Sequence, residues 1–202
     1  MNARRLLELG GVGAGIVLIA FGIGSLVLGL NARSTVRDEL KREFIVGSED
    51  MSPAETEKAV AEAGLTNVAI PSCDVAEKPI ETGTDARCFA QYMRIHALES
   101  SGGNTYAQMG RFVSAEDPSD PKGTSDEAAA AKDEDGKPIS NGARNTWVTE
   151  TALSTALNTS YMAEQIGLFS VVVGIALLLS GIGFLILALA VLGGRDRATT
   201  VN

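Results

Sequence analysis

Two long uncharged apolar runs, one near each end of the chain, constrain its fold more than any other feature. The first run covers residues 10–30 and the second covers residues 166–194. A bilayer core about 30 Å thick requires roughly 20 residues of helix at 1.5 Å rise per residue. Both runs meet this length, and a helix satisfies its own backbone hydrogen bonds inside lipid. The sequence therefore predicts transmembrane helices at 10–30 and 166–192, with residues 31–165 outside the hydrocarbon.

Most of the acidity of the protein lies between the two runs. Residues 31–165 carry 13 Lys and Arg against 23 Asp and Glu, while the whole chain has a formal net charge of −8. Binding to nucleic acid requires clustered Lys and Arg, and anionic lipid surfaces attract the same residues. The charge pattern therefore argues against nucleic acid as a partner and against a central segment that lies on anionic lipid.

The basic residues that flank the runs predict the orientation. Cytoplasmic flanks are enriched in Lys and Arg, and a loop longer than about 60 residues crosses largely regardless of its charge. The cations that favour cytoplasmic termini are Arg4, Arg5, Arg195 and Arg197, and those that argue the other way are Arg33, Arg37, Lys41 and Arg42. Because two spans place both termini on one side, we expect a multi-pass plasma-membrane protein with cytoplasmic tails at 1–9 and 193–202 and an extracytoplasmic domain at 31–165.

A cleaved signal peptide is the alternative reading of the N-terminus. The first apolar run is longer than the 7 to 15 residues, roughly, of a signal-peptide core, and a charged helical pattern follows it directly. We therefore expect a retained anchor.

The only two cysteines are Cys73 and Cys88, and both lie in the central segment. In an oxidising compartment such a pair usually forms a disulfide. A pair of free thiols or half of a metal site is the alternative, although a zinc site needs four ligands and the single histidine supplies at most one more. We expect the disulfide.

The central segment reads as mainly helical. The first span continues as a helix to about residue 45, and Ser52, Pro53 and Glu55 form the start of a helix that ends at Gly64. A third helix is expected over residues 85–100, capped by Thr84 or Asp85, with Phe89, Tyr92, Met93 and His96 as its apolar stripe. A fourth is expected from about residue 145 through the second span.

Two other stretches of the central segment are not expected to be helical. Residues 66–75 read as an extended piece that Pro71 limits to an edge strand at most. Residues 114–138 contain no aromatic and hardly any large aliphatic side chain. Such a stretch buries too little apolar surface to offset the entropy of ordering it, so we expect a mobile acidic loop.

Small residues recur every seven positions along both apolar runs. They are Gly15, Gly22 and Gly29 in the first run, and Gly167, Gly174, Gly181 and Ala188 in the second. A seven-residue repeat keeps one face toward a partner helix, and small residues let two backbones approach closely. Glycine is frequent in membrane helices, and Gly11 with Gly15 could equally serve a dimer. Two separate stripes favour packing of the two spans on each other.

If the spans pack in this way, their outward extensions pair as an antiparallel stalk. The expected stalk contacts are Val36, Leu40, Leu153, Leu157 and Tyr161. The predicted fold is thus mainly α: a two-pass transmembrane helical hairpin whose helices extend into a small, disulfide-tied α-helical extracytoplasmic cap with a mobile acidic loop at 114–138.

No catalytic or metal-binding set is expected. His96 is the single histidine, and on an apolar helix stripe we interpret it as a hydrogen-bonded structural residue. Residues 133–136 (DEDG) resemble the start of a calcium loop, but Ala131 and the absence of an acid at the twelfth position reduce this to non-specific cation attraction. We predict no cofactor, no metal and no catalytic residue.

Four stretches carry a resemblance to a known group of proteins. They are residues 86–99 (ARCFAQYMRIHALE), 105–112 (TYAQMGRF), 141–153 (NGARNTWVTETAL) and 158–165 (NTSYMAEQ). Together they resemble actinobacterial two-pass membrane proteins of unknown function, whose members often carry the label of aromatic ring-opening dioxygenase. A non-haem iron site needs about two histidines and a carboxylate, and this chain has one histidine. The resemblance therefore implies a topology and supplies no catalytic residue.

The expected function is that of a non-enzymatic integral membrane protein of the cell envelope. It would present the acidic extracytoplasmic domain to another membrane or envelope protein, or to a second copy of itself. Binding of a lipid or another apolar ligand between the glycine-striped helices is the alternative. An enzyme that uses loop carboxylates near His96 is a third possibility.

Overall fold

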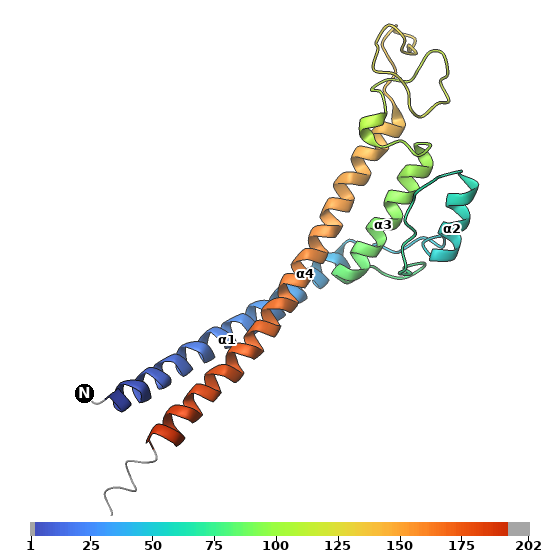
Figure 1. The fold of residues 1–202 in the computed structure, drawn as a ribbon. Helices are drawn as coiled ribbons and strands as arrows, with labels where there is room; N and C mark the ends of the chain where they lie inside the picture. The colour runs from blue at the N-terminus through green and yellow to red at the C-terminus, as the bar shows by residue number, and fades with distance from the viewer. Residues whose placement is uncertain (1–2, 194–202) are drawn as a thin grey trace, which may run out of the picture. The chain divides into compact units, whose positions relative to one another are not determined.

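The computed structural model describes residues 3–193, and this part of the chain is mainly helical, as expected (Figure 1). The helices are α1 (Ala3–Arg42), α2 (Pro53–Glu62), α3 (Gly83–Ser100), the 3-10 turn η1 (Tyr106–Gln108), α4 (Gly142–Ile186) and the π-helical turn η2 (Leu187–Gly193). Extended segments in this part of the chain form only isolated bridges and no strand. Arg195 and Arg197, used above for the orientation, lie outside the described residues.

The chain divides into two compact units. Among the described residues, unit 1 comprises residues 3–36 and 163–193, and unit 2 comprises residues 37–162. The two long helices α1 and α4 each contribute to both units. Residues 3–9, which fall in the expected cytoplasmic tail, form the first turns of α1.

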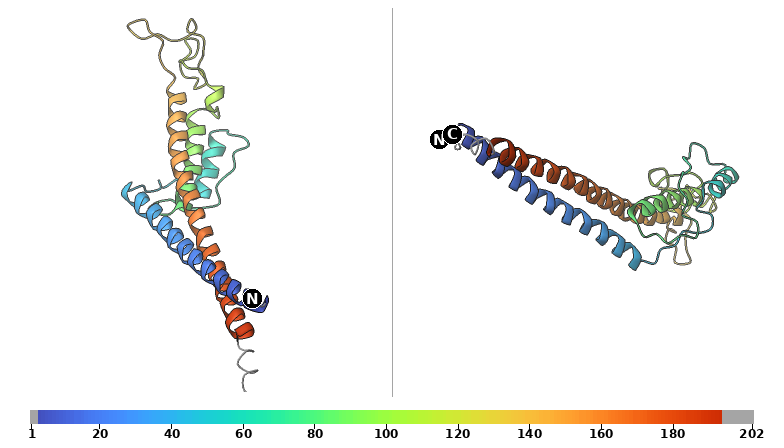
Figure 2. Two further views of the ribbon diagram at one scale, coloured as in Figure 1. Left: turned by 90° about the vertical axis from the view of Figure 1, so that its left-hand side faces the viewer. Right: turned by 90° about the horizontal axis from the view of Figure 1, so that it is seen from below.

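In unit 1, α1 and the second half of α4 lie side by side and run in opposite directions (Figures 1 and 2). Both helices are long and apolar enough to cross a membrane, at 38 and 49 residues for the candidate segments. Only 11% and 17% of their most apolar windows are buried. The two helices therefore cover one narrow face of each other and leave most of their apolar side chains exposed.

Unit 2 is a layered arrangement with α3 at its centre. α2 packs on one side of α3, and the first half of α4 runs along the other (Figure 2). The buried residues of α3 lie on two opposite faces, because helices cover it on two sides. They are Gly83, Ala86, Cys88, Ala90, Tyr92, Ile95 and Ala97. Of the expected stripe, Tyr92 is buried and Phe89, Met93 and His96 are half-buried, while small alanines also face a neighbouring helix.

Local sequence signals set the starts of the short helices. The Ser52 hydroxyl accepts the amide of Glu55 at the start of α2, and Gly64 follows its end with φ +64°. In α3, Thr82 is the N-cap and forms a reciprocal capping box with Asp85. The expected cap at Thr84 or Asp85 is therefore shifted by two or three residues, because Asp85 acts as the distal partner of the box.

Two expectations for the irregular segments have different outcomes. Residues 66–75, expected to be extended, form no strand and include the left-handed Asn67 at φ +61°. Isolated bridges form nearby, from Val46 to Pro79 and from Gly47 to Ala76. Residues 114–138, expected to be a mobile acidic loop, carry paired backbone hydrogen bonds. Among these, Ala115 donates to Ala129 and Ile139 donates to Ala131.

The order of this loop comes from hydrogen bonds and not from apolar burial. The carboxylates of Asp117, Asp120, Asp126 and Asp133 each accept a backbone amide two residues further on. Such turns offer the backbone local partners that do not require a hydrophobic core. Gly123 at φ +59° and Gly136 at φ +76° supply left-handed positions. Apolar content alone does not predict these contacts.

Candidate functional site

The glycines of the two apolar runs lie against each other in unit 1. Gly15 lies against Gly181, and Gly29 lies against Gly167, each with backbone of one helix close to backbone of the other. A Cβ added at Gly29 would stand 2.5 Å from the carbonyl oxygen of Gly167, and one at Gly15 would stand 2.9 Å from that of Gly181. Any side chain at these positions would force the helices apart. We call this contact the glycine seam.

Large side chains fill the spaces beside each glycine of the seam. Added Cβ atoms at Gly174 and Gly181 would stand 2.9 Å from Leu26 and 2.8 Å from Ile19. At the far end, Ala188 takes the place of a glycine, and its Cβ would stand 3.0 Å from one added at Gly11. Alternation of small and large residues across an interface is what close helix packing in membranes uses.

An ion pair closes the end of the glycine seam nearest unit 2 in the sequence. A guanidinium nitrogen of Arg33 lies 3.9 Å from a carboxylate oxygen of Glu164, and Glu164 is buried. The aliphatic part of the Arg33 side chain passes over Gly167, where an added Cβ would stand 2.9 Å from the Arg33 Cγ atom. Gly167 therefore accommodates the arginine as well as the facing helix. The repeat of small residues alone did not predict this pair.

The predicted disulfide is confirmed: Cys73 and Cys88 are bonded, with 6.1 Å between their Cα atoms. The bond joins the extended segment after α2 to the first turns of α3. Next to it, the hydroxyl of Tyr92, a fully buried residue, donates a hydrogen bond to the backbone carbonyl of Cys73. The disulfide and this hydrogen bond thus both fix Cys73 to α3.

The expected stalk residues have mixed environments. Leu40 and Leu157 are buried at 6% and 7% exposure, and Val36 and Tyr161 are half-buried. Leu40 lies near Ile45 and Ile80 at the end of α1. The Tyr161 ring lies beneath the guanidinium of Arg87 from α3, 4.6 Å from its centroid.

Leu153 does not take part in a buried stalk, because it is 49% exposed. Its neighbours Glu150 and Ser154 face inward in its place, and the Ser154 hydroxyl donates to Glu150 at 2.6 Å. Glu150 is 5% exposed. A pattern of apolar residues at four-residue intervals selects Leu153. It does not reveal that Glu150 and Ser154 face inward and are hydrogen-bonded to each other.

The inward face of α4 nonetheless follows a seven-residue spacing along its whole length. The positions that are buried or half-buried at this spacing are Glu150, Leu157, Glu164, Val171, Leu178 and Leu185. This spacing keeps one face directed at neighbouring helices, as in a coiled coil. The glycines lie beside this face, because Gly167, Gly174 and Gly181 each precede one of its residues by four positions.

Asn141 is a structural residue that sequence reasoning missed. Its side chain is buried, and its amide donates to the carbonyls of Gly110 and Pro121 at 3.1 and 2.9 Å. Its side-chain oxygen accepts the amide of Ala143 at 3.0 Å and so caps α4. Asparagine is a preferred helix N-cap residue, but the carbonyls that Asn141 binds are distant in sequence.

His96 has the hydrogen-bonded position expected for a structural residue. Its Nδ1 lies 3.1 Å from Glu99 on the same helix, and its Nε2 lies 3.6 Å from Asp50 before α2. Within residues 3–193, no group of three or more His, Cys, Asp or Glu side chains has the geometry to hold a metal ion. Asp133 in the DEDG sequence binds the amides of Asp135 and Lys137 instead.

Three ionisable groups in unit 2 have shifted pKa values. Hydrogen bonds from the Ala76 amide and then from Lys78 lower the pKa of Asp74 below its ordinary value. The Ser119 hydroxyl and amide lower the pKa of Asp117 in the same way. Burial, followed by the charge of Asp74, raises the pKa of Tyr92 above 10.0. Each shift has a structural cause, and none identifies a catalytic acid or base.

Comparison of this chain with known protein families, curated proteins and solved structures returns no match. The resemblance to actinobacterial two-pass membrane proteins therefore stays an expectation.

Proposed function

We propose that this protein is a two-pass integral membrane protein of the cell envelope that holds residues 31–165 outside the bilayer as an acidic domain for binding another envelope protein. One observation carries the membrane part of the proposal: the two helices of unit 1 direct glycines toward each other and large apolar side chains outward. Exposed examples are Phe21 at 68%, Leu28 at 70%, Phe169 at 67% and Leu179 at 67%.

This arrangement differs from that of soluble proteins. Monomeric soluble proteins rarely expose contiguous apolar patches larger than a few hundred Å². The core helix of a soluble protein is mostly buried, whereas the apolar windows of α1 and α4 are only 11% and 17% buried. A signal sequence would account for α1 alone, since α4 begins at Gly142. A bilayer is the environment that suits both helices.

Cysteine labelling tests the topology. The two natural cysteines are bonded, so a single cysteine introduced by Ser125→Cys in the exposed loop or by Ala3→Cys near the N-terminus gives a clean readout. With cytoplasmic termini, a membrane-impermeant maleimide applied to intact cells labels Ser125→Cys and labels Ala3→Cys only after permeabilisation. Labelling of the two variants in the opposite order, or recovery of the chain in the soluble fraction, would overturn the proposal.

The interaction role is supported by apolar side chains that unit 2 leaves exposed just after α1. Phe44 is 88% exposed with φ +50°, and Val46 is 56% exposed. An exposed aromatic in a left-handed conformation is unfavourable in water and is a reason to look for a function. Affinity purification in a mild detergent is the test. We expect a co-purifying protein or a self-associated species, and a strictly monomeric chain without partners would count against the interaction role.

A second candidate function, binding of a lipid or another apolar ligand, is favoured by one groove. The groove, about 420 Å³, lies in unit 1 between the start of α1 and the end of α4, and its lining is almost wholly apolar. It is lined by Leu6, Leu7, Gly10, Gly11, Ala14, Phe184, Leu187 and Ala188. Along the glycine seam itself the backbones are too close for an acyl chain.

Native mass spectrometry tests this second function. A retained lipid that is lost on Ala14→Phe, which fills the groove, supports it. Gly24→Phe is the matched control, because nothing lies within 4 Å of a Cβ at Gly24. Absence of any retained lipid in the wild-type protein, or equal loss in both variants, would rule out a specific groove ligand.

A further inference from the structure

An extended segment in unit 2 leaves its backbone without partners. Before it, the amide of Leu65 donates to Val60 and ends α2, and after it, the amide of Val75 donates to Met51. Across residues 66–72, no backbone N–H or C=O makes a hydrogen bond to any residue of the described part of the chain. A row of free donors and acceptors on an extended backbone is a template for pairing with another strand.

Two left-handed residues precede the extended part of the segment, Gly64 at φ +64° and Asn67 at φ +61°. At the other end, Pro71 is buried. Cys73 follows, fixed to α3 by its disulfide to Cys88 and by the hydrogen bond from Tyr92. A segment that is already extended loses little conformational entropy when it binds, which favours affinity.

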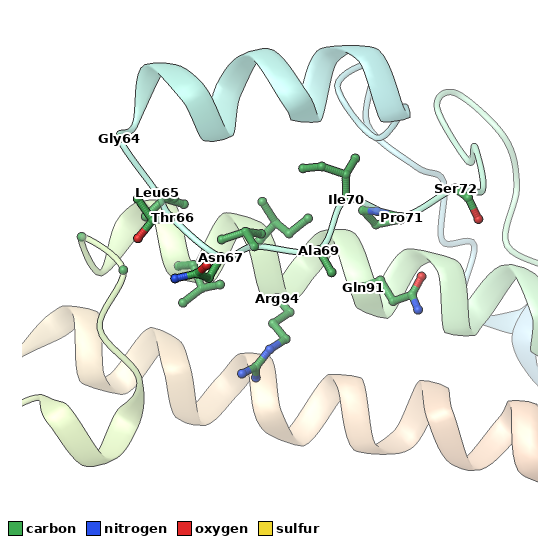
Figure 3. A pocket seen from close by; sticks show the side chains of 15 residues that line it. Gly64, Leu65, Thr66, Asn67, Ala69, Ile70, Pro71, Ser72, Gln91 and Arg94 are labelled. Carbon is green, nitrogen blue, oxygen red and sulfur yellow. The ribbon is translucent and has the colours of Figure 1, made fainter.

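A groove of about 810 Å³ lies beside this segment (Figure 3). Its other wall is α3, which contributes Gln91, Arg94, Ile95 and Leu98. Along the segment, Val68 and Ile70 are half-buried, while Thr66, Ala69 and Ser72 are exposed. Binding pockets typically have volumes of about 300 to 1,000 Å³, so the groove can hold several residues of an extended chain.

Arg94 is the one charged side chain among the residues that line the groove. It reaches from α3 toward α4 (Figure 3), where its guanidinium lies over the Trp147 ring, 5.1 Å from the centroid. The ring holds one face of the guanidinium and leaves the N–H groups at its edge available. No carboxylate of residues 3–193 lies within 4.0 Å of it; the nearby Glu150 binds hydroxyls instead.

We propose that residues 66–72 are an edge for β-strand addition, where an extended peptide of a partner protein pairs with this backbone and places a carboxylate on Arg94. Pro71 has no N–H and Asn67 is left-handed, so the backbone N–H and C=O groups from Val68 to Ile70 are those that another strand can match. The lone arginine in an acidic domain selects a negative group. This inference rests on the proposed interaction role and specifies the chemistry of the partner.

The test uses the full chain in detergent and a library of random eight-residue peptides with free C-termini. We expect selected peptides to lack proline in the paired stretch and to carry Asp, Glu or a C-terminal carboxylate at a constant position. Arg94→Gln should weaken binding of a selected peptide roughly tenfold or more. Arg87→Gln is the matched control, because Arg87 lies on the same helix over Tyr161 and does not line the groove. Its affinity should change less than about twofold.

A scan of N-methyl groups along the selected peptide distinguishes strand pairing from other binding and needs no protein variant. In a paired strand, the N–H groups of alternate residues face the partner. Methylation of one alternate set should therefore abolish binding, while methylation of the other set should leave it. Equal loss in both sets, no peptide selected above scrambled controls, or equal effects of Arg94→Gln and Arg87→Gln would overturn the inference.

Failure of this inference and failure of the proposed function are separable. The peptide assay measures the purified chain and depends neither on topology nor on a natural partner. If a co-purifying protein is retained equally by wild type and Arg94→Gln, the interaction role stands and the strand-addition site is wrong. If labelling contradicts the membrane topology, peptide binding to residues 66–72 is still measured independently.

Discussion

Gly22 and Gly174 leave each other no room for a side chain. A Cβ at Gly22 would stand 2.9 Å from the carbonyl oxygen of Gly174, and a Cβ at Gly174 would stand 2.8 Å from that of Gly22. The contact is reciprocal, which is the geometry of two antiparallel helices that approach by their backbones. This contact can be tested directly, because α1 also has glycines, such as Gly24, at which an added Cβ would have no atom within 4 Å.

Adding one methyl group at the glycine seam should destabilise the packing of the two helices. We expect Gly22→Ala to cost about 1–3 kcal/mol, the usual range for overpacking. Gly24→Ala is the control, since nothing lies within 4 Å of its Cβ, and it should be neutral or gain up to about 1 kcal/mol from helix propensity. Thermal unfolding in detergent measures both variants. Equal effects at the two positions would contradict the glycine seam.

Reduction of the Cys73–Cys88 bond should destabilise unit 2. The bond closes a sequence separation of 15 residues, for which the chain-entropy argument gives about 3 kcal/mol. The double variant Cys73→Ala, Cys88→Ala should lower the urea midpoint of unit 2, followed by Trp147 fluorescence. Thiol titration of the denatured wild-type protein should find no free thiol before reductant is added. Two reactive thiols at that stage would show that the bond does not form.

Removal of the Tyr92 hydroxyl should leave the carbonyl of Cys73 without its partner. Tyr92→Phe is expected to cost about 1 kcal/mol near neutral pH, the usual worth of one hydrogen bond. Tyr106→Phe is the control, because Tyr106 is 42% exposed, and it should change stability by less than about 0.5 kcal/mol. Urea denaturation at pH 8 measures this difference.

Alkaline pH should destabilise the wild-type protein through the same residue. Folding raises the pKa of Tyr92, so its stabilising contribution is complete below the unfolded pKa of about 10 and is lost as the pH rises through the folded pKa. The free energy of unfolding should therefore fall between pH 9 and 11, roughly, and fall less steeply in Tyr92→Phe. Parallel pH profiles for the two proteins would contradict the assignment.

Loss of the Asn141 side chain should release the loop that precedes α4. Asn141→Ala removes the cap of α4 and the hydrogen bonds to Gly110 and Pro121, for an expected cost of about 2–3 kcal/mol. Hydrogen exchange should accelerate across residues 110–124. Asn145→Ala is the control on the same helix, because Asn145 is exposed and its side chain makes no contact of this kind. Similar exchange in both variants would show that Asn141 does not anchor the loop.

The sequence predicts best those features that depend on neighbours within a few residues or on overall apolar length. Ser52 and Gly64 mark α2 because caps bind amides and carbonyls of their own helix. The cap of α3 is Thr82 and not Thr84 or Asp85, because Asp85 is the N3 residue of the capping box and binds the Thr82 amide. The prediction that Leu153 is buried was wrong. Hydrophobicity does not reveal that Glu150 and Ser154 face inward in its place and form a hydrogen bond with each other.

The sequence by itself determined two lipid-length apolar helices, a repeat of small residues every seven positions, one pair of cysteines and an acidic middle. Only the tertiary structure decided which glycines face each other, that Asn141 anchors a loop through Gly110 and Pro121, and that residues 66–72 stay unpaired beside Arg94. The reason is physical: spacing along a chain sets local geometry, while a hydrogen bond or a contact across a long loop depends on where two distant segments come to lie.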